Sequence, residues 1–239
     1  HDLAKELDPG RPTAVGLEGN ADFNFRLGKD TIRLRAEGYM KNSNPSFYYR
    51  HYHSQHYWWD NDLHKEFRTR LGGSIGIDRW HTRLYAGVEN IKNYTYLAGT
   101  PYMYPENIFS ATPRSLSNIT ARQYAKNLQV LSSTLYQDFK LGILHWDNEA
   151  TVQYSSNQDV LPLPLVNLYS NLYLQFTYAK VLRIQLGGDM RWFSRYYAPD
   201  YAPALEQYFV QEGAQRVELG GYPFINAYIN FHLKQVRFY

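Results

Sequence analysis

The chain has 239 residues, of which 44% are hydrophobic and 17% aromatic, and its formal net charge at pH 7 is +3. So small a charge, without a long basic run, argues against a nucleic-acid-binding protein, and the absence of cysteine excludes disulfides, thiolate metal sites and a cysteine nucleophile. No run of about 18 apolar residues occurs, so the sequence predicts no transmembrane helix.

The N-terminal part of the chain alternates apolar and polar residues, which is the period of a β-strand with one apolar face. We expect residues 1–12 to form a loop, the first strand to run from Ala14 to Leu27, and the second to run from Thr31 to Met40 after a tight turn at 28–30. Residues 47–62 are nearly all aromatic, histidine or polar, and we interpret them as a strand extension and loop above a membrane.

Four strands are expected in the middle of the chain. They cover Phe67–Asp78, Thr82–Val88, Leu128–Asp138 and Ile143–Ser155, and the pattern does not show which face of the third is apolar. Residues 91–123 are rich in Tyr, Asn, Ser and Pro and have no period, so they are interpreted as one long loop.

The clearest hairpin lies in the C-terminal third. Two alternating stretches, 171–178 and 182–192, are separated by a break that suits a tight antiparallel turn. Each arm has the ~10 residues that a tilted strand needs to cross the hydrocarbon layer of a bilayer. A ninth strand is expected over residues 224–234, and a tenth begins after a turn near residue 235.

Short and long connections alternate strictly along the chain. Short turns are expected near residues 29, 80, 140, 180 and 235, and long loops at 42–64, 92–125, 156–168 and 196–222. This asymmetry is typical of an outer-membrane barrel, which has short periplasmic turns and long outer loops. The sequence therefore predicts an all-β fold, an antiparallel up-and-down transmembrane β-barrel of at least ten strands, in which residues 1–239 form a single domain that is incomplete at both ends.

The polar rows of these strands carry many full charges, whereas the apolar rows of most strands carry none. Burying so many ions in a dry core would cost several kcal/mol each unless they were paired. A water-filled lumen removes that cost, so we predict that the charged rows line a pore: Arg33, Arg35, Arg68, Arg70, Arg83, Glu89, Asp147, Glu149, Arg183, Asp189 and Arg191. The five arginines on the second to fourth strands form a strip that either attracts anions or is neutralised by Glu18, Glu37, Asp78 and Glu89.

Aromatic residues are the second sign of a membrane. The chain has 23 tyrosines although its mean hydropathy is −0.55. Tyr and Trp concentrate where acyl chains meet water. We predict an interfacial aromatic belt of Tyr57, Trp58, Trp59, Trp80, Trp146 and Trp192. A soluble tyrosine-rich sheet that binds glycans is the alternative.

Two groups of residues could carry chemistry. His51 and His53, with His56, Asp60 and Asp62 nearby, have a spacing that can bind zinc or copper, but we interpret them as a polar cluster of an outer loop and expect no metal. His145, Asp147 and Glu149 alternate on one face and could act as a general base with carboxylate neighbours. No activated serine accompanies them, so we interpret them as lumen wall and expect neither enzymatic activity nor a cofactor.

Four runs carry a resemblance to a known family: HYWWDND at 56–62, RLYAGVENIKNY at 83–94, LGILHWDNEATVQYS at 141–155, and GGYPFINAYINFHLKQVRFY at 220–239. They resemble the putative porin family of Bacteroidetes-type bacteria. The resemblance implies an outer-membrane β-barrel, supplies no catalytic motif, and implies that family members extend beyond this chain at both ends.

The expected function is therefore a passive channel for small hydrophilic solutes in the bacterial outer membrane. One alternative is a non-conducting accessory barrel of a larger outer-membrane complex, whose long loops at 92–125 and 196–222 bind other outer-membrane proteins or lipoproteins. The other is the soluble glycan-binding domain. Outer-membrane lipid is the expected surrounding of the apolar rows, and no nucleic acid is expected as a partner.

Overall fold

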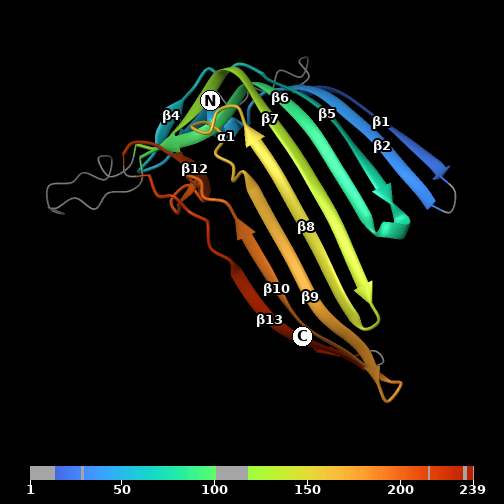
Figure 1. Ribbon diagram of the computed structural model, residues 1–239. Coiled ribbons are helices and arrows are strands. Elements are labelled where there is room, and N and C mark those ends of the chain that lie inside the picture. Colours follow the sequence, from blue (N-terminus) through green and yellow to red (C-terminus); the bar gives the residue numbers. More distant parts are fainter. Residues whose placement is uncertain (1–13, 28–29, 101–117, 215, 234–235, 239) are drawn as a thin grey trace, which may run out of the picture.

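The computed structural model describes residues 14–27, 30–100, 118–214, 216–233 and 236–238. The long strands are β1 (Ala14–Leu27), β2 (Asp30–Ser43), β5 (Glu66–Ile77), β6 (Thr82–Gly99), β7 (Thr120–Leu141), β8 (Leu144–Ser155), β9 (Val166–Tyr178), β10 (Leu182–Phe193) and β13 (Phe224–Leu233), followed by the short β14 (Val236–Phe238). They form one antiparallel sheet in the order β1-β2-β5-β6-β7-β8-β9-β10-β13-β14, in which each strand lies beside the next one along the chain. This order confirms the predicted up-and-down topology, and Figure 1 shows the sheet as a curved wall that is not closed.

The short turns lie together at one end of this wall (Figure 1). The turn between β5 and β6 is the 3₁₀ turn η1 (Asp78–Trp80), which ends at His81 with φ 49°. The turn between β9 and β10 spans residues 179–181 and has positive φ at both Ala179 and Lys180, the backbone conformation that suits a tight hairpin turn. The predicted turns near residues 80, 140 and 180 are confirmed, and those near 29 and 235 lie outside the described residues.

One face of the wall is apolar and uncovered. A single cross-strand row on this face runs over eight neighbouring strands through Phe23, Leu34, Ile75, Leu84, Leu135, Ala150, Leu168 and Trp192. Many side chains of this face are largely exposed, for example Leu71 at 65% and Ile225 at 71%. At about 25 cal/mol per Å² of apolar surface, so wide a face is unfavourable in water and requires an apolar surrounding.

β6 and β7 are longer than the sequence predicts, so residues 91–123 are not one loop. β6 continues to Gly99 and β7 starts at Thr120, while residues 101–117 lie outside the described part. The pattern failed here because the register shifts at Asn93, whose φ is 59°, so the alternation changes phase. Gln123 holds this bulge, since its Nε2 donates to the carbonyls of Asn93 and His64 at 3.1 and 2.8 Å.

The long-loop end of the wall carries small elements that the sequence did not predict (Figure 1). Residues 47–60 form α1 (Phe47–Arg50) and a hairpin of β3 (His51–His53) and β4 (Trp58–Asp60). Residues 200–211 form a second hairpin of β11 (Asp200–Ala202) and β12 (Gln207–Gln211). We call these two segments the cap. None of the helices among the described residues has the length and apolar composition to cross a membrane.

The two segments of the cap meet around one tryptophan. Trp59 is 4% exposed and clusters with Leu97 and Ala121 of the wall, Phe209 of the second segment, and Ile119, Ala202 and Leu205. Its indole Nε1 donates to the carbonyl of Tyr48 at 2.9 Å. The predicted interfacial position of Trp59 is therefore wrong, because an aromatic run looks the same in sequence whether lipid or another loop covers it.

The second segment of the cap reaches across the end of the wall. It belongs to the connection between β10 and β13, yet β12 pairs in parallel with the end of β6, through Val210 opposite Ala98 and Gln211 opposite Gly99. Arg122 of β7 also lies 2.7 Å from Glu212. Residues 196–222 were predicted as one long loop, but the structure shows a hairpin within them, and its strand β12 pairs with the end of β6.

Candidate functional site: the polar face

The second face of the wall carries the predicted charged rows. Side chains on this face reach over a whole intervening strand: the Tyr39 hydroxyl donates to Glu89 at 2.9 Å, the Tyr85 hydroxyl to Glu37 at 3.1 Å, and the Tyr228 hydroxyl to Asn171 at 2.8 Å. Such convergence is expected on the concave side of a curved sheet. The polar face is therefore the inside of the curve, and the apolar face is the outside.

The arginine strip on β2, β5 and β6 is mostly neutralised. Arg33 Nη2 lies 2.6 Å from Asp78. Arg35 Nε lies 3.5 Å from Glu37 and 3.8 Å from Asp22. The strip was predicted either to attract anions or to be neutralised by nearby carboxylates, and neutralisation holds for most of its arginines. Glu18 is not among the partners found in the described part of the chain.

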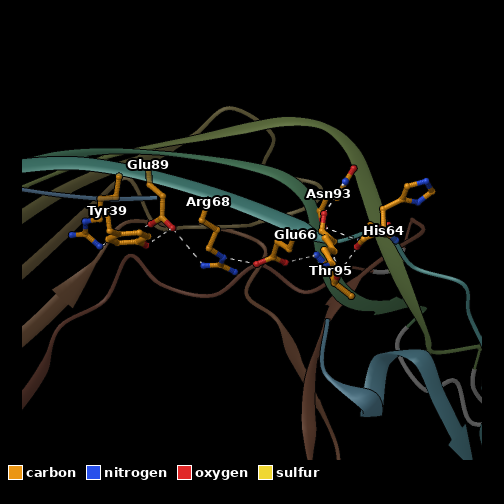
Figure 2. Close-up of polar contacts among 10 residues, drawn as sticks. Tyr39, His64, Glu66, Arg68, Glu89, Asn93 and Thr95 are labelled. Atoms are coloured by element: carbon orange, nitrogen blue, oxygen red, sulfur yellow. Dashed lines mark hydrogen bonds and ion pairs between the residues drawn. The ribbon is translucent and has the colours of Figure 1, made fainter. Parts of the chain in front are cut away.

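Toward the cap the pairs join into one network, which Figure 2 shows along the strands. Glu89 accepts from Tyr39 and lies 3.5 Å from Arg68 and 3.9 Å from Arg70. Arg68 also binds Glu66, whose other oxygen accepts from the backbone N–H of Thr95 at 3.2 Å. Both glutamate side chains are at most 16% exposed, so the network ties β2, β5 and β6 together beneath the bulge.

The polar face of β8 to β13 has a different chemistry. Tyrosines and amides dominate: the His145 ring stacks on Tyr173 with 4.9 Å between centroids, and Asn226 donates to Asp189 at 3.2 Å. Arg191 lies over the ring of Tyr169 at 5.4 Å. The His145 ring thus stacks on a tyrosine of the neighbouring strand.

All eleven predicted pore-lining residues lie on the polar rows of their strands, six on β2, β5 and β6 (Arg33, Arg35, Arg68, Arg70, Arg83 and Glu89) and five on β8 and β10 (Asp147, Glu149, Arg183, Asp189 and Arg191). Their role in a pore stays a prediction. The predicted pore-lining set omitted Tyr39, Glu66 and Tyr85, which complete the network. The signal was available, since each of these alternates with apolar residues on its strand.

The remaining residues of the predicted belt lie at both ends of the wall. Trp80 and Trp146 are 60% and 45% exposed near the short turns, whereas Trp192 lies at the long-loop end of β10. Trp58 is 62% exposed on the cap, and Tyr57 packs beside the Trp59 cluster. A belt made of these residues remains a prediction.

The histidines of the cap make a clasp on one carboxylate. His51 Nδ1 lies 2.8 Å from one oxygen of Asp60, and His53 Nε2 lies 2.9 Å from the other. The His53 ring also stacks on Trp58 with 3.6 Å between centroids. In the part of the chain that the structure describes, no three His, Cys, Asp or Glu side chains are grouped to hold a metal ion.

The clasp predicts a pH dependence of cap stability. Hydrogen bonds from His51 first and His53 second lower the pKa of Asp60 below its usual value. A lowered pKa means that the carboxylate stabilises the folded cap above the usual pKa, and that this stabilisation is lost as the pH falls through the lowered pKa. We expect Asp60→Asn to lower the thermal midpoint of the cap, followed by tryptophan fluorescence, at pH 6–7 but not near pH 2. A difference that stays constant over this range would contradict the clasp.

A family model described as "Putative porin" matches residues 2–239. The chain belongs to this family.

Among solved structures it is similar to the siderophore receptor PirA from Acinetobacter baumannii, with a TM-score of 0.52 and 14% sequence identity. That similarity covers 92% of this chain and 35% of the receptor chain, so the porin-family chain spans about a third of the receptor's length. At this identity the likeness shows the fold alone, a curved β-barrel wall. No curated protein matches the chain in sequence.

Proposed function

We propose that this chain forms the wall of an outer-membrane channel through which small hydrophilic solutes diffuse passively. One observation carries the proposal: the outer face of the curved sheet is an uncovered apolar surface, and its inner face is lined by charges and tyrosines. Lipid on one side and water on the other is the arrangement that suits both faces. Passage through such a pore requires no catalytic step and no cofactor.

Single-channel recording tests the proposal. The full-length protein, reconstituted into a planar bilayer in KCl, is expected to give discrete steps of conductance that grow with salt concentration. Protein that inserts into lipid vesicles but leaves the bilayer silent would contradict a channel. Protein that fails to partition into detergent would instead support a soluble glycan-binding domain.

A second candidate is an accessory barrel with a blocked lumen, and the cap favours it. The cap joins segments from two long loops at the end of the wall and is held there by β12 on the edge of β6. Its exposed surface, including Trp58 and Tyr208 at 62% and 68%, could bind another outer-membrane protein or a lipoprotein. If loosening the cap by Trp59→Ala opens a conductance that wild-type protein lacks, the blocked barrel is the better description.

A further inference from the structure

Arg83 is the exception in the arginine strip. Its four companions each lie within 4 Å of a carboxylate, but in the described part of the chain no ion pair involves Arg83. Its guanidinium instead lies over the ring of Tyr136, its partner on β7, at 4.8 Å from the centroid. A ring face holds the guanidinium plane without consuming its N–H donors, so the charge and the hydrogen-bonding edge of Arg83 remain available.

The wall beside Arg83 is hollow because its neighbours on β5 are small. Gly76 lies opposite Arg83, and Ser74 lies opposite Tyr85. A Cβ built on Gly76 would meet only one atom, 3.9 Å away. Two adjoining hollows of about 550 and 480 Å³ share Arg35, Ser74, Arg83 and Tyr136. Each has room for a small organic solute.

The charge balance inside the second hollow is positive. Its ionic residues are Arg35, Glu37 and Arg83. Glu37 is already engaged by Arg35 at 3.5 Å and by the Tyr85 hydroxyl at 3.1 Å. In the first hollow Asp78 is held by Arg33 and Asp22 lies 3.8 Å from Arg35, while Asp138 acts on Arg83 only at longer range, without an ion pair. Arg83 is therefore the cation at the junction of the two hollows that has no carboxylate within ion-pair distance in the described part of the chain.

We infer that Arg83, with Arg35 beside it, binds the carboxylate or phosphate group of a small solute in these hollows. The planar fork of a guanidinium matches two oxygens of either group, and such charge-assisted pairs are the strong ones. The Ser74 and Thr134 hydroxyls line the same hollow and can donate to the remaining oxygens. This inference deepens the proposed channel function, on which it rests, by assigning it organic anions as a substrate class.

Binding can be measured without an open pore. Full-length protein in detergent is titrated with inorganic phosphate and, separately, with acetate by calorimetry, which distinguishes the two anions. Losing a charged hydrogen-bond partner predicts a phosphate affinity that is ~10-fold or more weaker in Arg83→Gln. Arg191→Gln is the matched control, because Arg191 also lies over a tyrosine but does not line these hollows. Arg191→Gln is expected to change the phosphate affinity by less than about twofold. The phosphate affinity of Arg83→Lys is expected to lie between those of Arg83→Gln and Arg191→Gln.

The outcomes separate the two proposals. In bilayers under a potassium phosphate gradient, Arg83→Gln is expected to shift the reversal potential toward cation preference while conductance persists. Suppose that the protein conducts but Arg83→Gln and Arg191→Gln weaken the phosphate affinity to the same extent, or that the wild type binds neither phosphate nor acetate. Either result refutes the site at Arg83 and leaves the channel proposal intact. If phosphate binding depends on Arg83 but no conductance is found, the site stands and the channel is refuted.

Discussion

Replacing Trp59 by alanine is expected to unfold the cap while the wall stays intact. Truncating a buried tryptophan costs about 3–5 kcal/mol in cores of this kind. Here the ring is 4% exposed, stacks on Tyr52 with 4.9 Å between centroids, and touches both segments of the cap. Tyr48 reinforces the junction, because its hydroxyl donates to the carbonyl of Leu205 at 3.4 Å. Burial also raises the pKa of Tyr48 to about 12.

Limited proteolysis measures this effect, because cleavage within residues 200–211 requires the second segment to detach. Trp59→Ala is expected to accelerate that cleavage strongly, whereas the neighbouring Trp58→Ala should have a small effect, since Trp58 is 62% exposed and contacts mainly the His53 ring. Trp59→Phe keeps an aromatic ring but loses part of the packed surface and the bond to the Tyr48 carbonyl, so cleavage is expected to be intermediate between wild type and Trp59→Ala. Equal protection of residues 200–211 in all three variants would show that Trp59 does not join the segments.

Leu186→Arg is expected to cost about 2–4 kcal/mol of the free energy of unfolding in lipid vesicles. Leu186 lies near the middle of β10 on the apolar face, between Leu174 and Ile229 on the neighbouring strands, and is 48% exposed. An arginine there would have to carry its charge into the hydrocarbon layer. Reversible unfolding in guanidinium chloride, from vesicles, gives the free energy directly.

Gln185→Arg is the matched control on the same strand. Gln185 is on the polar face, opposite Gln175 and Asn230, where the charge would meet water and amide groups. Its cost is expected to stay below about 1 kcal/mol, as for most substitutions away from buried features. Similar costs for the two variants would mean that the outer face of the wall is not in contact with lipid.

Much of the fold could be predicted because its determinants are local. The alternation along β1 and β10 shows which residues share a face, and the three-residue break at 179–181 shows where the hairpin turns. These signals need only the period of a strand and the sterics of a turn. On β7 the apolar Leu128 lies in the polar row, opposite Ile91, because Val160 packs against it and buries it. Apolar residues therefore occur on both faces of this strand, and the alternation did not show which face is outside.

The candidate site was predictable in its members but not in its pairing. The sequence alone shows that Arg33, Arg68 and Arg83 lie on one face of neighbouring strands. Which of them is neutralised depends on side chains that reach across a strand, such as Tyr85 to Glu37. Only the folded chain therefore distinguishes Arg83 from the other arginines of the strip.

By itself the amino-acid sequence determined the two faces of the wall, its up-and-down order and the end at which the turns are short. These properties follow from the residue-by-residue period of a strand and from connection length. The tertiary structure alone decided the cap, the bulge at Asn93 and the partner of each charge. These features join residues far apart in the chain, such as Trp59 and Phe209, and no local pattern records which distant segments will pack together.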